Sequence, residues 1–134
     1  MKRTLVAAAL LLGTAMGAGA QDSAPDFTGT WIGDFDVVAM GRSADAKGEV
    51  RKVKVTYDLQ HQEGRLIWGT VAADDGPGRP LVLAFSLNNG TLIGSDTEGL
   101  HRITIMSATT LESCFTDNGS GSIVATCGIV TKSE

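Results

Sequence analysis

The chain has 134 residues and a formal net charge of −4 at pH 7, with 11 Lys and Arg against 15 Asp and Glu. That length is enough for one domain with a single core. The acidic balance, without any basic run, argues against nucleic acid and anionic membrane surfaces as partners.

Residues 1–20 have the pattern of a cleaved secretory signal peptide. Lys2 and Arg3 form a short positive segment, residues 5–12 are apolar, and small residues ending in Ala20 precede Gln21. The apolar run is shorter than the roughly 20 residues of a membrane-spanning helix. We therefore expect a periplasmic or secreted protein that is not embedded in the membrane, the alternative being an uncleaved anchor.

The mature part, residues 21–134, is predicted to be one β-domain. After a small polar arm at 21–25, short runs rich in Val, Ile, Thr and aromatic residues recur between Gly, Asn, Asp and Pro. The one long connection, residues 40–48, is the only one able to lie across the end of a barrel. The eight predicted strands are 28–39, 50–61, 65–73, 80–87, 91–95, 100–107, 110–116 and 122–131.

Alternation along these runs predicts which side chains face inward. In the last two runs both alternations carry apolar residues, so their inner face stays open. Arg102 is predicted to point outward; a reversed register would place it inside as an anchor for a carboxylate. The predicted inward set is Phe27, Trp31, Phe35, Val37, Val53, Val55, Tyr57, Leu59, Leu66, Trp68, Leu81, Leu83, Phe85, Leu87, His101, Ile103 and Ile105.

The predicted fold class is all-β, an eight-stranded antiparallel up-and-down barrel. Short turns make each strand pair with its sequence neighbours. An open meander of eight strands would expose two edges, and closing it into a barrel removes both.

Cys114 and Cys127 are the only cysteines, and in an exported chain they predict one disulfide. A hairpin turn within residues 117–121 would place the two positions opposite each other, close enough for the bond. The alternative is a pair of free buried thiols.

The start of the first strand, Gly29-Thr30-Trp31, resembles the G-x-W motif of lipocalin-like and avidin-like barrels. The mature chain also resembles a group of small exported bacterial proteins of unknown function that share the G-T-W start and a C-terminal cysteine pair. The resemblance implies that Trp31 plugs the closed end of the barrel and that Lys132 stacks on it. The chain is shorter than a true lipocalin, and with Trp31 and Trp68 as its only mature tryptophans a biotin site is not expected.

No catalytic motif is present, and neither His61 nor His101 lies in a recognisable one. We therefore expect no catalytic residue, no metal site and no cofactor, although Ser95, Asp96 and His101 can be written as a triad on paper. The acidic turns at 74–78 and 96–98 are interpreted as turns rather than cation sites.

The leading functional prediction is that a small, largely apolar ligand binds in the barrel mouth, lined by Tyr57, Trp68 and Phe85. An eight-stranded barrel is just wide enough to be filled by side chains or to hold one small ligand, and both outcomes fit the inward set. The alternative is a protein-interaction module, such as an inhibitor of an exported hydrolase that uses the arm at 21–25 or the barrel loops. A third hypothesis is a structural envelope component with a filled barrel.

Overall fold

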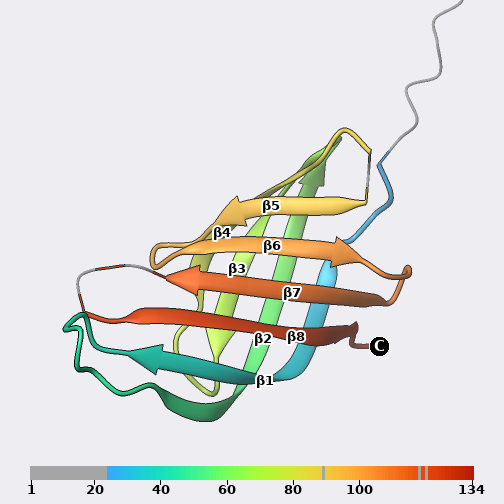
Figure 1. Ribbon diagram of the computed structural model, residues 1–134. Coiled ribbons are helices and arrows are strands. Elements are labelled where there is room, and N and C mark those ends of the chain that lie inside the picture. Colours follow the sequence, from blue (N-terminus) through green and yellow to red (C-terminus); the bar gives the residue numbers. More distant parts are fainter. Residues whose placement is uncertain (1–23, 89, 118, 120) are drawn as a thin grey trace, which may run out of the picture.

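Eight antiparallel strands close into one barrel, in which each strand pairs with its sequence neighbours and β8 returns to β1 (Figure 1). The computed structural model describes residues 24–134 except 89, 118 and 120, so the predicted signal peptide lies outside the described residues. The predicted all-β, eight-stranded up-and-down barrel is confirmed. The strands are β1 (Gly29–Met40), β2 (Glu49–Glu63), β3 (Leu66–Ala73), β4 (Arg79–Phe85), β5 (Thr91–Ser95), β6 (Leu100–Ile105), β7 (Thr110–Asp117) and β8 (Ile123–Lys132).

The strand pattern follows the alternation of apolar and polar residues. In β1, Trp31 and Phe35 are buried while Asp34 and Asp36 are exposed. Tyr57 of β2 is buried too and lies opposite Trp31 in the β1–β2 register. One face of each strand therefore builds the interior, as the sequence predicts.

The predicted inward orientation of Leu66 and Trp68 is wrong. Both are exposed on the outer face of β3, and it is Ile67 and Val71 that are buried. Both alternations of β3 carry apolar residues, so the pattern alone favoured the bulkier pair. Gly69 faces inward instead, where a Cβ atom would lie 1.9 Å from the backbone oxygen of Asp58.

A second correction concerns Leu87, which is 95% exposed because β4 ends at Phe85. The backbone N–H of Ser86 donates to the carbonyl of Thr91 and closes the following turn. Asn89, in this turn, lies outside the described residues.

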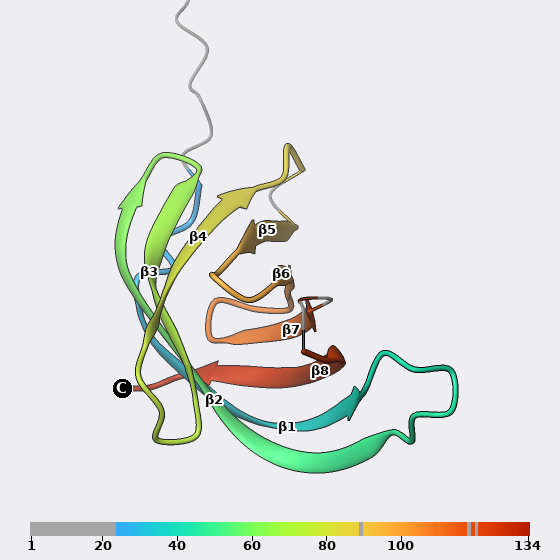
Figure 2. The ribbon, with the colours of Figure 1, turned by 90° about the vertical axis from the view of Figure 1, so that its left-hand side faces the viewer.

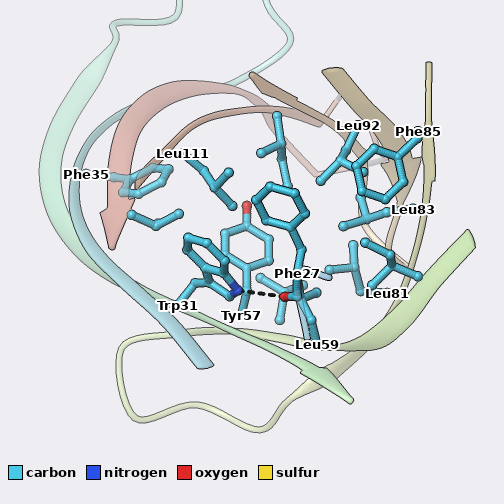
Figure 3. Close-up of a cluster of buried hydrophobic side chains, with 14 of the residues drawn as sticks. Phe27, Trp31, Phe35, Tyr57, Leu59, Leu81, Leu83, Phe85, Leu92 and Leu111 are labelled. Atoms are coloured by element: carbon cyan, nitrogen blue, oxygen red, sulfur yellow. Dashed lines mark hydrogen bonds between the residues drawn. The ribbon is translucent and has the colours of Figure 1, made fainter. Parts of the chain in front are cut away.

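The closed end of the barrel is plugged by Trp31 and Phe27. Trp31 Nε1 donates to the carbonyl of Phe27 at 3.0 Å, and their rings stack with centroids 5.7 Å apart (Figure 3). Lys132, opposite Trp31 in the β1–β8 register, places Nζ 5.6 Å from the indole centroid, so the predicted contact is confirmed. Gly29 has a φ of 120°, and a Cβ there would lie 3.0 Å from Lys132 Cε. The glycine of the G-x-W motif thus leaves room for the lysine to cover the tryptophan.

The opposite end is the mouth, formed by the turns that follow β1, β3, β5 and β7. An up-and-down meander brings these four connections to the same end. The long β1–β2 loop does not lie across it, because the loop projects away from the barrel (Figure 2). Arg42 Nη2 of this loop donates to the carbonyl of Gly119, which ties the loop to the β7–β8 turn.

The predicted disulfide between Cys114 and Cys127 is present. The two residues are directly opposite each other in the β7–β8 register, with Cα atoms 4.0 Å apart. The bond therefore links two strands that are already paired by backbone hydrogen bonds, and the barrel does not need it to hold distant segments together.

Replacing both cysteines with serine is expected to lower the free energy of unfolding by no more than about 3 kcal/mol, the entropic estimate for a loop of this length. The hairpin keeps its backbone ladder, so the far-ultraviolet circular dichroism spectrum should be unchanged. Urea unfolding of wild type and the double variant measures the difference. A spectrum typical of an unfolded chain for the double variant in buffer would contradict this account of the bond.

Candidate functional site

A cavity of about 120 Å³ lies at the mouth, away from the Trp31 plug. Its wall is apolar and comes from the inner faces of β1, β2, β3 and β8, with Phe35, Val53, Val55, Val71 and Val124 among its residues. Its polar lining includes Tyr57, Arg79, Glu98 and His101. The cavity therefore has one apolar side and one side that carries hydrogen-bonding groups.

The polar side is organised around the hydroxyl of Tyr57. This oxygen lies 3.0 Å from His101 Nδ1 and 2.6 Å from Ser113 Oγ, and all three side chains are buried. The residues come from β2, β6 and β7, so barrel closure is what brings them together. Figure 3 shows the Tyr57 ring in the middle of the barrel with its hydroxyl away from Leu59.

The far side of His101 meets a buried ion pair. Asp96 Oδ2 accepts from Arg79 Nε at 3.1 Å and from Arg79 Nη2 at 3.0 Å, and its carboxylate has no exposed surface. Arg79 Nε also lies 3.4 Å from Glu98 Oε2 at the more exposed rim. Two charge-assisted hydrogen bonds to one carboxylate make this a strong arginine–carboxylate contact.

The β5–β6 turn holds Asp96 in place. Its Oδ1 accepts from the backbone N–H groups of Glu98 and Gly99, at 2.7 Å and 2.8 Å. Aspartate side chains commonly cap turns in this way. Gly99 is needed because a Cβ there would lie 2.2 Å from the carbonyl oxygen of Thr116. The acidic turn predicted from the sequence therefore positions one carboxylate at the mouth.

His101 Nε2 has no hydrogen-bond partner, and within the described part of the chain no other buried side-chain nitrogen or oxygen lacks one. The atom lies 3.3 Å from Asp96 Oδ2, close enough for electrostatic attraction. The direction of approach, however, is not that of a hydrogen bond, and that oxygen already accepts twice from Arg79. We therefore describe the contact with Asp96 as electrostatic.

The pKa values follow from burial and these contacts. Burial raises the pKa of Tyr57 to about 12 and, by disfavouring the imidazolium, lowers the pKa of His101 despite the attraction of Asp96. Burial opposes ionisation of Asp96, but the Glu98 and Gly99 N–H groups, His101 and Arg79 together hold the pKa of this carboxyl below its ordinary value. At neutral pH the site therefore has a neutral phenol and imidazole beside an ionised carboxylate.

Of the three predicted ligand-lining residues, the structure places only Tyr57 at the cavity. Phe85 is buried, but it packs against Phe27 with ring centroids 5.8 Å apart, which puts it near the closed end. Trp68 lies outside the barrel, where its ring stacks on His61 at 5.4 Å. The predicted lining role of Phe85 and Trp68 is therefore corrected.

Two other sequence hypotheses are decided by the register. Arg102 is exposed, so the alternative of an inward carboxylate anchor at that position is wrong. Ser95 pairs with the outward residues Val82 and Leu100, so it does not join Asp96 and His101 in a triad.

Sequence reasoning missed Arg79 and Ser113. Arg79 begins β4 directly after a turn cluster, where a charged residue is ordinarily solvated. Ser113 alternates with Leu111 and Phe115, and that inward pattern could have been found had the inner face of β7 been decided. A serine at a buried position between apolar ones indicates a hydrogen-bonding neighbour in the interior.

The outer surface of β3 to β6 is unusually apolar. Leu66, Trp68, Val82, Ile93 and Leu100 are all exposed there, on adjacent strands. The expectation of an exported protein partner stays a prediction.

Residues 24–134, apart from the three undescribed positions, contain no cluster of three or more His, Cys, Asp or Glu suited to a metal ion. In the same described segments, no helix is long and apolar enough to cross a membrane.

No protein-family model matches the sequence, and no curated protein matches it. Among solved structures, a redesigned β-barrel is similar with a TM-score of 0.44 and 15% identity, covering 80% of this chain and 91% of its own. The S-type phycobiliprotein lyase CPES from Guillardia theta has a TM-score of 0.38 and 13% identity, covering 81% of this chain and 89% of its own. The closed barrel and its cysteine pair agree with the coarser part of the predicted resemblance, a small β-barrel. Membership of the lipocalin-like or avidin-like families stays a prediction.

Proposed function

We propose that the protein is an exported, non-enzymatic barrel that binds one small, largely apolar molecule in the cavity at its mouth. The observation that carries the proposal is the cavity itself, which has an apolar wall and a few convergent polar groups, the usual composition of a ligand site. The disulfide supports export, because such bonds persist in oxidising compartments.

The volume limits the ligand. Pockets for drug-sized ligands span about 300–1,000 Å³, whereas this cavity is about 120 Å³. An engineered apolar cavity of about 150 Å³ holds a single benzene ring. The proposed ligand is therefore about one ring in size.

The polar groups support binding rather than catalysis. The hydroxyl of Ser113 is engaged with Tyr57, whose phenol has its pKa raised to about 12 by burial, so neither group is an activated nucleophile at neutral pH. Arg79 and Asp96 are occupied with each other. These contacts suit a rigid recognition surface.

The experiment that tests the proposal fills the cavity. Val55 lines it from β2, and Val55→Phe adds a ring to the space that the ligand would occupy. We expect a one-ring probe such as cyclohexanone to bind the wild type with a Kd of about 1 mM or tighter, a reasonable ligand efficiency for so few atoms. We expect Val55→Phe to lose this binding. Titration followed by chemical-shift changes in two-dimensional NMR measures it.

The matched control is Val50→Phe. Val50 lies on the same strand but is 73% exposed, so the same substitution there should leave probe binding unchanged. Val55→Ala enlarges the cavity and should keep binding, which separates the loss of space from any disturbance of this position. Equal binding by wild type and a folded Val55→Phe variant would rule out the cavity as the site.

A further inference from the structure

The first part of β2 has an open strand edge beside the mouth. Residues 49–53 pair with β1 on one side, whereas the β2–β3 ladder begins only at Val55. Figure 2 shows this part of β2 running beyond the end of β3. At Lys54 the turn after β3 closes the edge, because Asp74 donates its backbone N–H to the Lys54 carbonyl at 2.6 Å and accepts from the Lys54 N–H through Oδ1 at 2.9 Å. The edge therefore stays open before Lys54.

The direction of the backbone groups decides what this edge offers. Successive residues of a strand point their N–H and C=O groups to opposite sides. Because those of Lys54 point to the β3 side, those of Lys52 and Val50 point there too. In the described part of the chain no backbone hydrogen bond is made to them on that side. The Lys52 side chain is bound to Asp36 of β1 at 2.9 Å, away from the edge. The edge is therefore accessible to a further strand.

The charges along the edge favour a second copy of this chain as that strand, paired antiparallel about Val50. In this register Glu49 lies opposite Arg51 of the second copy, and Val50, which is 73% exposed, lies opposite its equivalent. A two-fold axis at Glu49, Arg51 or Lys52 would instead place like charges opposite each other, which destabilises a strand pair. An axis further along would meet the turn that holds Asp74. The register about Val50 is therefore the self-complementary one.

We propose that two copies of the protein associate through residues 49–53 of β2, paired antiparallel about Val50, so that the sheet continues from one barrel into the other. The Val50 pair exchanges two backbone hydrogen bonds, and each Glu49 meets Arg51 of the other copy. Arg51 also lines the mouth cavity, so the second copy brings its Glu49 to the rim of that cavity. The overlap is short and belongs to the weak, transient class of interfaces, so we expect a Kd of about 0.1 mM. The association does not depend on ligand binding.

Sedimentation equilibrium at about 0.01–1 mM protein, a range that brackets this Kd, measures the monomer–dimer equilibrium. Arg51→Glu places two acidic pairs across the interface and Glu49→Arg places two basic pairs there, so each should raise the Kd by about 10-fold or more. Arg102→Glu is the matched control, because it makes the same change of charge at an exposed position on β6. This control should keep the wild-type Kd.

The two single variants test the register when they are mixed. In a mixed dimer of Glu49→Arg with Arg51→Glu, both cross-strand pairs again combine opposite charges. The mixture should therefore associate about as tightly as the wild type, although neither variant does so alone. The double variant Glu49→Arg/Arg51→Glu exchanges the two charges and should likewise recover the wild-type Kd.

A wild-type protein that stays monomeric at about 1 mM would overturn the proposal. A dimer whose Kd is unchanged by both single charge reversals would also overturn it, since such a dimer would use another surface, such as the apolar outer face of β3 to β6. Failure of the mixed variants to associate would refute the pairing about Val50. None of these outcomes bears on ligand binding in the cavity.

Discussion

Replacing Trp31 with alanine is expected to lower the free energy of unfolding by about 3–5 kcal/mol, the usual cost of deleting a buried large aromatic side chain. The indole has no exposed surface, donates to the Phe27 carbonyl and is covered by Lys132, so its loss leaves a void and unpairs a buried carbonyl. Urea unfolding followed by circular dichroism measures the change.

Trp68→Ala is the matched control for this substitution. Trp68 is 40% exposed on the outer face, so its truncation should cost much less than that of Trp31. Where the Trp31→Ala variant is still folded, it should bind a one-ring probe as the wild type does, because the plug and the mouth are at opposite ends. A Trp31→Ala variant of wild-type stability would refute the role of the indole as the plug.

Replacing Asp96 with alanine is expected to cost about 3 kcal/mol, at the lower end of the range for breaking a buried ion pair. The variant leaves Arg79 without the carboxylate oxygen that accepts from its Nε and Nη2, and it removes the acceptor for the Glu98 and Gly99 N–H groups. The side chain of Arg79 is 24% exposed, so part of its lost contact is replaced by water, which limits the cost. Thermal and urea unfolding both measure it.

The variant Asp96→Asn separates the contribution of the negative charge to stability from that of the hydrogen bonds that Asp96 accepts in the turn. An asparagine keeps the Oδ1 acceptor for the two N–H groups and loses the negative charge, so it should cost less than alanine. The folded pKa of Asp96 is below its ordinary value of 3.8. Its charge therefore contributes stability above about pH 4 that is lost as the pH falls through the folded pKa. The difference between wild type and Asp96→Asn should shrink in acid, and a difference that grew there would contradict the assignment of the charge.

The fold could be predicted because the alternation in β1 and β2 exposes a mostly polar face and buries an apolar one. The same rule failed for Trp68, since both faces of β3 are apolar and only the close approach of Gly69 to the backbone of β2 distinguishes them. Alternation also predicts whether a side chain points into the barrel, but not at which end of the barrel it lies. Phe85 is inward as predicted, yet it lies near Phe27 rather than at the mouth.

The polar side of the cavity could not be predicted from the sequence, and the reason differs from that for Trp68 and Phe85. Tyr57, Arg79, Asp96, His101 and Ser113 come from four strands and one turn, and no short motif links them. Only the closed register places the Tyr57 hydroxyl between His101 and Ser113. Single residues of this group were visible in the sequence, but their juxtaposition is a property of the barrel.

The central claim is that the mouth cavity holds the ligand, and it is tested most directly by nuclear Overhauser contacts from a bound one-ring probe. Tyr57 is the only tyrosine in the chain, so its ring protons are a unique reporter inside the cavity. We expect contacts from cyclohexanone to Tyr57 and to the methyl groups of Val55, and none to Trp31 at the closed end. Contacts to Trp68 on the outer face without any to Tyr57 would contradict the account.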